Sequence, residues 1–363
     1  MDGRHPFVLG IETSCDDTAC AVVDGDGRVL ASVVSSQLAH LPYGGVVPEI
    51  ASREHLRNWP AVYEAALAAA DVGLGEIDAV AATRGPGLVG ALLVGLSLGK
   101  SLAYGLGREF HGIHHMEAHL FSPFLRLGGE PAETPPESFV GLVVSGGHTL
   151  LLGVENAGAA GRIETLAETR DDAIGEAFDK LGKRLGLPYP QGPKVDALAE
   201  RGDAARCPLP LAGRANPQNS ELYFSYSGLK SQALLELEKL GRGGVDRTLT
   251  QDANGTFDLA PEVLDLVAGF RAAAVAQVLD RLTVLHRRRP VPLLAVSGGV
   301  AANRLLRREV VAWGERAGVP VRLVPLAYSG DNAAMIAWRA LLRRRAGVAD
   351  DPFAVEAQSR IAL

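Results

Sequence analysis

The chain has 363 residues, of which 47% are hydrophobic and 21% are charged, and its formal net charge at pH 7 is −6. This balance excludes a disordered or fibrous chain and fits a folded protein long enough for two domains. The slight acidic excess excludes a protein-wide positive field, so a nucleic-acid partner would need local basic patches or help from other proteins.

Cysteine usage and the apolar segments both point to the cytoplasm. Cys15, Cys20 and Cys207 have no paired spacing, which indicates neither a disulfide framework nor a cysteine zinc site. The longest apolar run, residues 85–99, is shorter than the ~20 residues of a membrane span, and the amino-terminal residues lack a signal-peptide apolar region. We therefore expect a cytoplasmic protein without a membrane partner.

Two β-hairpins with polar tips are predicted far apart in the chain. Residues 7–12 and 19–23 are apolar runs typical of strands, with a polar turn between them. Residues 139–144 and 150–154 repeat the arrangement around the turn SGGHT. A strand, polar turn and strand that recur about 130 residues apart predict two related lobes.

The segment between these hairpins alternates helices with a strand. Residues 50–70 and 88–104 are predicted to be helical, and the second of these helices is rich in Gly and Ala. Residues 79–83 are predicted to form the strand between them.

A proline-containing stretch at residues 128–136 is the best candidate for a linker. We therefore predict a first lobe over residues 1–127 and a second lobe over residues 128–363. Within the second lobe, strand patterns stop at residues 165–258, which predicts a mainly helical insertion there.

The α/β pattern resumes after this insertion. Residues 293–297 and 321–325 are predicted strands, and a helix is expected after the first of them. A second helix is predicted over residues 333–345, with Asp331 or Asn332 suited to cap its start. Residues 347–363 show no periodic pattern, and we expect an irregular or frayed end.

Two histidines, His115 and His119, lie four residues apart in a predicted helix. At this spacing they project from one face and can bind one divalent metal, and imidazoles suit iron, zinc, nickel or copper better than magnesium or calcium. Glu117 is turned about 200° around the helix from the first histidine, so it is badly placed as the base of a zinc protease. The alternative is that these histidines serve packing only.

Asp331 offers the missing third metal ligand. A carboxylate in the Gly-Asp-Asn turn before a helix can point outward, although simple capping of that helix is an equal alternative. Two histidines and one carboxylate leave coordination positions open for a substrate, a pattern typical of catalytic iron or zinc sites.

Paired glycines follow two of the predicted strands, in the turns that begin at Ser145 and Ser297. Such turns allow the backbone to approach a ligand and to donate N–H groups to phosphate. With the polar tip of the first hairpin they could converge on one nucleotide, or they could be three unrelated turns. Asp179, in a carboxylate-rich helix, could accept hydrogen bonds from ribose hydroxyls, or it could belong to a solvated helix face.

Eight motifs resemble one known family in unbroken order between residues 8 and 345: GIETSCDDTACAVVD, YGGVVPEIASREH, GPGLVGALLVG, HHMEAHL, LVVSGGHT, DDAIGEAFDK, SGGVAANR and GDNAAMIA. The chain resembles the TsaD family, also called Gcp, of bacterial tRNA N6-adenosine threonylcarbamoyltransferases. The resemblance implies the α/β fold of actin, sugar kinases and heat-shock chaperone ATPases, with two lobes, each with an RNase H-like core, and a ligand cleft between them.

The resemblance also implies the reaction and the site residues. The family transfers a threonylcarbamoyl group from threonylcarbamoyl-adenylate to N6 of the adenosine beside the anticodon, in tRNAs that read codons beginning with A, and releases AMP. Its metal ligands fall on His115, His119 and Asp331, and the metal is iron, or alternatively zinc. Its substrate contacts fall on Val143, Val144, Ser145, Gly146, Gly147, Asp179, Gly192, Asp196 and Asn303.

The implied mechanism requires a proton acceptor for the adenine amine. Glu12 and Asp16, at the tip of the first hairpin, are the candidates for this catalytic role. Two departures from the family pattern affect local loops: Gln191 replaces a glycine of PGGP, and Gly330 replaces a threonine.

The resemblance further implies partners for tRNA modification. These are a TsaB-type paralogue, which binds first-lobe helices, and a TsaE-type small ATPase. Two other classes of protein remain alternatives: a metallopeptidase, which would use the same histidines, and a sugar-kinase or chaperone-like ATPase, which would use the same loops with magnesium.

Overall fold

The computed structural model describes residues 6–157, 161–211 and 221–363. The chain divides into two compact units. Unit 1 comprises Met1–Phe139, Gly153–Glu164 and Arg322–Leu363, and unit 2 comprises Val140–Leu152 and Thr165–Val321.

Unit 1 is built on a five-stranded sheet in the order β3-β2-β1-β4-β5. Its strands are β1 (Phe7–Glu12), β2 (Asp17–Val23), β3 (Val29–Ser36), β4 (Ile77–Gly85) and β5 (Glu109–His114). The first two are antiparallel, which confirms the first predicted hairpin, whereas β4 runs parallel to both β1 and β5. The carboxyl ends of β1, β4 and β5 therefore meet at one edge of the sheet.

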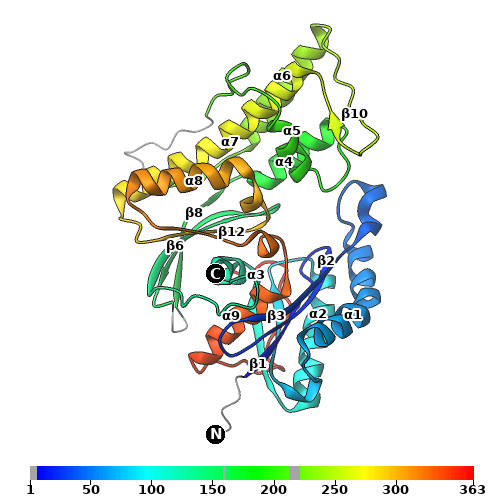
Figure 1. The fold of residues 1–363 in the computed structure, drawn as a ribbon, viewed down its shortest axis with the longest axis vertical. Coiled ribbons are helices and arrows are strands. Elements are labelled where there is room, and N and C mark those ends of the chain that lie inside the picture. Colours follow the sequence, from blue (N-terminus) through cyan, green and yellow to red (C-terminus); the bar gives the residue numbers. More distant parts are fainter. Residues whose placement is uncertain (1–5, 158–160, 212–220) are drawn as a thin grey trace. The chain divides into compact units, whose positions relative to one another are not determined.

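Helices cover both faces of this sheet (Figure 1). On one face lie α1 (Pro48–Ala70), which packs on β2 and β3, and α2 (Val89–Leu106), which packs on β4. On the other lies α9 (Ala333–Arg345), which packs on β1 and contacts the short helix α3 (His115–Phe121). Gly10 on β1 allows α9 to approach the sheet closely. A Cβ at this position would lie 2.3 Å from the carbonyl oxygen of Ala333.

Among the described residues, α2 is the helix long and apolar enough to span a bilayer. In unit 1, α2 packs against β4 and α1. Its buried residues contribute to the hydrophobic core of the unit. Unit 1 also contains the short 3-10 helices η1 (Leu38–Tyr43), η2 (Leu74–Glu76) and η3 (Ser122–Phe124).

The carboxyl-terminal segment returns to unit 1. After η5 (Leu326–Tyr328) and α9, residues 347–363 cross the unit and bond to it. Gln358 N donates to the Arg84 carbonyl at 2.8 Å, and Gly87 N donates to the Ser359 carbonyl at 3.3 Å. Of the two expectations, an irregular or a frayed end, the structure shows an irregular tail that is hydrogen-bonded to the unit. The predicted ranges 1–127 and 128–363 also differ from the compact units here, because α9 packs on β1 and β2.

The second sheet, most of which lies in unit 2, has the order β13-β12-β6-β7-β8-β9. Its strands are β6 (Ser138–Val144), β7 (Thr149–Glu155), β8 (Arg162–Thr169), β9 (Tyr223–Phe224), β12 (Leu294–Ser297) and β13 (Val321–Leu323). Apart from β9, this order repeats that of the first sheet: a hairpin and its third strand, then two strands on the other side. The second predicted hairpin is confirmed, and so is the internal duplication.

Helices dominate the rest of unit 2. They are α4 (Ile174–Arg184), α5 (Gly192–Ala199), α6 (Ser227–Arg242), α7 (Pro261–Arg288) and α8 (Arg304–Ala317), with the 3-10 turn η4 (Gly299–Ala302) before α8. In the described residues between 165 and 258, the regular structure consists of α4, α5 and α6, the end of β8, the strand β9, and the short hairpin of β10 (Thr250–Gln251) and β11 (Phe257–Asp258).

Candidate functional site

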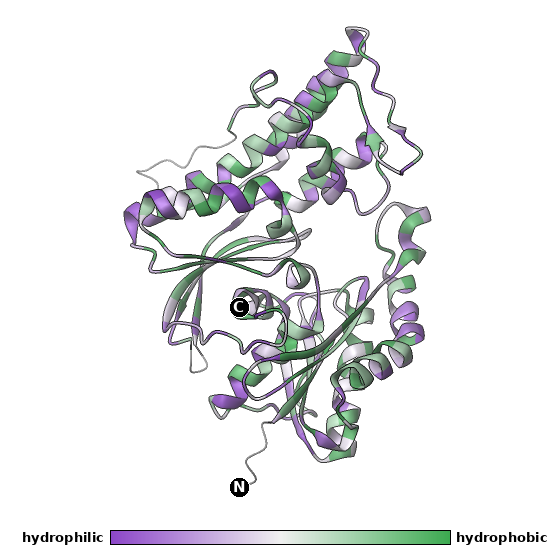
Figure 2. Cartoon of the chain, in the orientation of Figure 1, coloured by the Kyte–Doolittle hydropathy of each residue, from purple (hydrophilic) through white to green (hydrophobic). Residues whose placement is uncertain are grey.

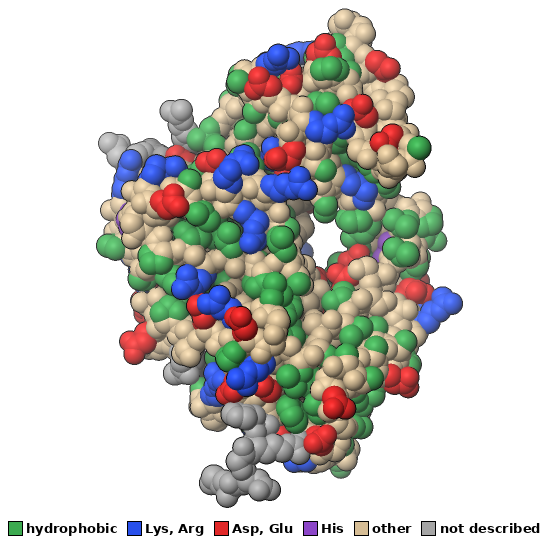
Figure 3. Space-filling model, viewed as in Figure 1, with side chains coloured by type: hydrophobic (Ala, Val, Ile, Leu, Met, Phe, Trp, Pro, Cys, Tyr) green, Lys and Arg blue, Asp and Glu red, His purple; other side chains and the backbone are tan. Residues whose placement is uncertain are grey.

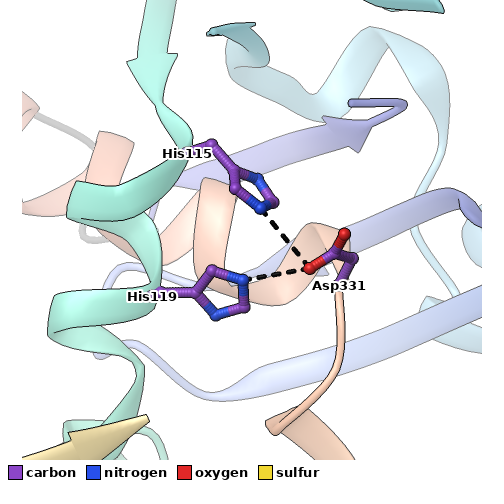
Figure 4. Close-up of side chains that lie close together, drawn as sticks. All are labelled: His115, His119 and Asp331. Carbon is purple, nitrogen blue, oxygen red and sulfur yellow. Dashed lines mark hydrogen bonds and ion pairs between the residues drawn. The ribbon is translucent and has the colours of Figure 1, made fainter. Parts of the chain in front are cut away.

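The buried side chains of His115 and His119 and the partly exposed Asp331 form a cluster in unit 1 (Figure 4). His115 is the first residue of α3, directly after β5, and His119 follows one turn later. The Nε2 atoms of both rings face the Asp331 Oδ1, at 3.4 Å from His115 and 3.0 Å from His119. One potential ligand atom from each residue lies within 4.8 Å of the others, so the three side chains can converge on one metal ion.

Asp331 is free for this contact because its neighbour caps α9. The Asn332 Oδ1 accepts a hydrogen bond from Met335 N at 3.0 Å, and its amide donates to the carbonyls of Tyr328 and Gly330. Of the two residues predicted as caps, Asn332 is therefore the cap. A Cβ at Gly330 would meet no neighbouring atom. The glycine that replaces the family's threonine is therefore not required by a lack of space.

A second carboxylate, Glu12, orients the first histidine. It lies at the end of β1, is fully buried, and accepts a hydrogen bond from His115 Nδ1 at 3.0 Å. Thr83 Oγ1, at the end of β4, and Ser14 N donate to the same carboxylate. Metal-binding histidines commonly donate their other ring nitrogen to a carboxylate in this way, which fixes the tautomer and the ring orientation.

Electrostatics in this cluster favours a cation. Burial by itself lowers the pKa of His115, but Glu12 and Asp331 outweigh it and raise that pKa to about 10. Burial by itself raises the pKa of Asp331, but the two histidines outweigh this effect and hold the pKa of its carboxyl well below the usual range. The same carboxylates that raise the pKa of His115 would also stabilise a divalent cation bound at its Nε2. The donor set fits a metal with imidazole and carboxylate ligands.

The other polar residues of the HHMEAH segment have different roles. His114 caps α3 by accepting from Met116 N at 3.1 Å, and its Nε2 lies 3.3 Å from the Ile361 carbonyl. Glu117 points away from the cluster and pairs with Arg339 at 2.9 Å. This position agrees with the prediction that Glu117 is badly placed to activate a metal-bound water.

Asp16, the other predicted catalytic carboxylate, lies in the turn between β1 and β2. It is partly exposed, and its carbonyl accepts a hydrogen bond from Gln37 N at 3.0 Å. In contrast, Glu12 is fully buried and already accepts three hydrogen bonds.

In unit 2 the two glycine turns lie side by side. The strands β6 and β12 are parallel neighbours, with Val143 opposite Ser297. Gly298 adopts φ +90°, and a Cβ there would lie 2.3 Å from the Val144 carbonyl oxygen, so only glycine fits. Ser297 Oγ is buried and has no hydrogen-bond partner in the described part of the chain.

The predicted substrate-binding turn after β6 is open at both glycines. Ser145 closes the turn, since its backbone N donates to the His148 carbonyl at 2.8 Å and its Oγ accepts from His148 N at 3.1 Å. Gly146 and Gly147 have no atom near the position a Cβ would occupy. The turn thus offers accessible backbone to a ligand.

Asp179 and Gly192 contact each other. Asp179 Oδ1 accepts from Gly192 N at 2.8 Å, where α5 begins. Burial raises the pKa of Asp179, while the N–H groups of Gly192 and Gln191 act to lower it. Gln191 has φ −85° and ψ −38°, an ordinary right-handed conformation, so its replacement of the family's glycine needs no unusual backbone.

Asp196 and Asn303 belong to a buried network centred on Arg271. The Arg271 guanidinium donates to Asp196 Oδ1 at 2.9 Å and to Glu200. Asn303 Nδ2 donates to the same Asp196 oxygen at 2.7 Å, and Arg304 N donates to the other at 3.2 Å. The structure thus brings two predicted substrate contacts together, and these polar groups are already paired with protein.

Asn303→Ala is expected to lower the free energy of unfolding by about 2 kcal/mol. Asn303 is the N-cap of α8, where its Oδ1 accepts from Leu306 N at 2.9 Å, and a cap contributes about 1 kcal/mol. The lost hydrogen bond to Asp196 adds about 1 kcal/mol. Urea unfolding measures the total. Asn303→Ser keeps a cap and should lose less; equal losses in the two variants would contradict the capping role.

Two residues of these networks escaped the sequence analysis. Thr83 ends a predicted strand, and its role depends on β4 lying beside β1, which no local pattern reveals. Arg271 does leave a signal, because it is a lone charge in the apolar helical run VAGFRAAAVAQV of α7. Such a charge inside a buried helix needs a carboxylate partner.

Comparisons with solved structures show the fold. The chain is similar to HypF of T. kodakarensis, with a TM-score of 0.56 and 15% identity over 93% of this chain and 48% of that one. It is also similar to component A of (R)-2-hydroxyglutaryl-CoA dehydratase from Acidaminococcus fermentans, with a TM-score of 0.50 and 15% identity, over 94% and 99% of the two chains. The actin-like ATPase fold expected from the resemblance is confirmed.

Sequence comparisons show the family. A model described as "TsaD: tRNA N6-adenosine threonylcarbamoyltransferase" matches residues 28–338. Proteins named tRNA N6-adenosine threonylcarbamoyltransferase are similar over most of their length: that of Pelobacter propionicus is 47% identical over 91% of this chain and 90% of its own, and that of Sorangium cellulosum 44% identical over 94% and 93%. The chain therefore belongs to the TsaD family and is a tRNA N6-adenosine threonylcarbamoyltransferase.

Proposed function

We propose that this transferase takes its threonylcarbamoyl group from threonylcarbamoyl-adenylate and releases AMP. The acceptor in this proposal is N6 of the adenosine beside the anticodon, in tRNAs that read codons beginning with A. The observation that supports it best is the cluster of His115, His119 and Asp331, in which Glu12 orients His115, in a chain of this family.

His115 Nε2, His119 Nε2 and Asp331 Oδ1 are the atoms that would hold one divalent metal. Iron is our first choice and zinc the second, since both accept imidazole and carboxylate ligands. Such a metal supplies Lewis-acid polarisation of the acyl carbonyl. Glu12 keeps the His115 Nδ1 proton in place, so that Nε2 faces the ligand position.

The adenine amine is a poor nucleophile because its lone pair is delocalised into the ring. Rate enhancement must therefore come mainly from alignment and from carbonyl activation, and AMP is already a good leaving group. Glu12 and Asp16 remain the carboxylates proposed to take the amine proton. Asp16 is our first choice, because it is partly exposed, whereas Glu12 is fully buried and would act through His115.

The adenylate moiety is assigned to unit 2. Backbone N–H groups of the turn Ser145-Gly146-Gly147 would bind its phosphate, beside Val143 and Val144 at the end of β6. Asp179, Gly192, Asp196 and Asn303 are proposed to line the nucleoside part. Gly146 and Gly147 support this assignment, since neither is covered by neighbouring atoms.

Lys and Arg residues gather in three helices, α4, α8 and α9, and these groups differ in what they can offer to tRNA. The arginines at the end of α9 are occupied: Arg343 pairs with Asp350 and Arg344 with Glu109. Lys180 pairs with two carboxylates. Figure 3 shows Lys and Arg side chains over α8, where Arg304 and Arg308 are exposed. We propose that this face contributes phosphate contacts.

Because several of these basic side chains are already paired with carboxylates, we infer that tRNA binding needs other proteins. We propose a TsaB-type paralogue, bound through first-lobe helices such as α1 and α2, and a TsaE-type small ATPase. The compartment is the cytoplasm, and no membrane is involved. A metallopeptidase is not favoured, because the carboxylate between the histidines, Glu117, is paired with Arg339.

Mass spectrometry of nucleosides tests the proposed reaction. Anticodon stem-loop RNA is incubated with threonine, bicarbonate, ATP, an adenylate-forming enzyme and the two partner proteins, with and without this chain. We expect threonylcarbamoyladenosine only when the chain is present, and a much lower yield when the partners are omitted. Absence of the modified nucleoside from the complete mixture would contradict the function, and equal turnover without partners would contradict their role.

A further inference from the structure

The turn η1 of unit 1 exposes an unusual amount of apolar surface. Leu38 is 71% exposed, Leu41 46% and Tyr43 60%. Single exposed apolar residues are ordinary on a protein surface, but three on one six-residue turn form a patch. Figures 2 and 3 show this hydrophobic turn before the amino-terminal end of α1.

The turn is held rigid from beneath by two buried polar side chains. His40 Nε2 donates to Gln37 Oε1 at 2.9 Å, and His40 Nδ1 accepts from Val47 N at 3.2 Å. The backbone amide at Val47 can only donate, so the proton of the neutral ring is on Nε2. Gln37 Nε2 in turn donates to the Ala51 carbonyl at 3.2 Å, which ties the turn to α1.

The same turn is joined directly to the loop that carries Asp16. Gln37 N donates to the Asp16 carbonyl at 3.0 Å. One residue earlier, Ser36 on β3 lies opposite Asp17 on β2 and donates to its carboxylate at 2.5 Å. The apolar patch and the His115 cluster therefore belong to one compact unit, and the loop between β1 and β2 contacts both, since Ser14 Oγ lies 3.4 Å from His115 Nδ1.

We propose that Tyr43, with Leu38 and Leu41, forms a platform on which a base of the tRNA anticodon loop stacks while the neighbouring adenosine enters the site. This inference rests on the proposed function, because it takes the acceptor to be an adenosine within a loop. Presenting N6 requires that adenosine to leave its stacked position, which costs a few kcal/mol. Stacking of a neighbouring base on a tyrosine ring offsets that cost.

The size of the patch favours a base over a protein. A stable protein interface buries roughly 800 Å² on each partner, far more than three side chains on one turn expose. A single base needs only a surface of about its own ring area. The rigid backing by His40 and Gln37 also suits stacking, because a preordered surface loses little entropy when the base binds.

Two measurements on the full chain test this platform. The first is the KM for an anticodon stem-loop in the complete transfer mixture, for wild type, Tyr43→Ala, Tyr43→Trp and Phe353→Ala. Phe353 is the matched control, an aromatic residue of the same unit that is 79% exposed. We expect Tyr43→Ala to raise KM roughly tenfold with kcat largely kept, and Tyr43→Trp and Phe353→Ala to stay near wild type.

The second measurement does not depend on turnover. A stem-loop with fluorescent 2-aminopurine beside the reactive position is titrated with each variant, and stacking on Tyr43 should quench its emission in wild type but not in Tyr43→Ala. The slope of log affinity against log salt should be the same in both, because tyrosine neutralises no phosphate. Equal quenching and equal KM in wild type and Tyr43→Ala would overturn the platform even if transfer is intact. Unchanged KM with lost binding of a partner protein would identify the patch as a protein interface instead.

If wild type transfers nothing, the proposed function fails. The fluorescence titration still decides whether Tyr43 binds a base.

Discussion

His115→Ala and His119→Ala are each expected to abolish metal binding and threonylcarbamoyl transfer together. Each substitution removes one of three ligand atoms, and the two that remain cannot fix one ion in the geometry the reaction needs. Elemental analysis of purified variants measures the metal, and the stem-loop assay measures transfer. We expect occupancy well below wild type and transfer at background level.

The control for this experiment depends on the partner of Glu117. Since Glu117 pairs with the buried Arg339, alanine at position 117 would leave a buried guanidinium without its carboxylate and destabilise the fold. Glu117→Gln keeps an acceptor for Arg339 and should retain most of the metal and the activity. Full metal occupancy in the double variant of His115 and His119 would show that the metal binds elsewhere.

Glu12→Gln is expected to weaken metal binding by about 10- to 100-fold. The carboxylate accepts from Ser14 N, Thr83 Oγ1 and His115 Nδ1, and a glutamine amide has only one oxygen with which to accept. At least one of these donors must therefore lose its partner, and the negative charge that stabilises a cation at His115 is removed. Competition with a chelator measures the metal affinity, and the transfer assay is run at saturating metal.

The two roles considered for Glu12 give different results in this experiment. If Glu12 acts by holding His115, excess metal should restore much of the transfer activity to Glu12→Gln. If it takes the amine proton, metal affinity should stay near wild type and transfer should not recover. Thr83→Val is the matched control, because it removes one donor from Glu12 without changing the carboxylate, and we expect a smaller loss of affinity.

The sequence predicted those parts of the fold and the site that depend on local pattern. The hairpins follow from apolar runs around polar turns, and the spacing of His115 and His119 follows from the helical period. The cap before α9 shows where local reasoning ends: Asp331 and Asn332 are both good caps, and only the structure shows that Asn332 bonds to Met335 N while Asp331 faces the histidines.

Contacts between distant segments could not be predicted in this way. The bond from His115 to Glu12 exists because β1, β4 and β5 end at the same edge of a sheet, and strand order is a property of the tertiary structure. The network around Arg271 likewise joins α5, α7 and the start of α8, which are far apart in sequence. The return of residues 322–363 to unit 1 arises from packing of α9 on β1, where Gly10 allows close approach.

That return has a consequence for how the polypeptide folds as it leaves the ribosome. Nearly all of unit 2 lies in one stretch, Thr165–Val321, whereas unit 1 is completed only by Arg322–Leu363. Domains generally fold as units during synthesis, in the order in which they emerge. Here the surface of β1 that α9 covers stays exposed until residues 333–345 have been synthesised. The sheet of unit 1 is thus synthesised before most of unit 2 but completed after it, so its α9-facing surface stays uncovered while unit 2 is made.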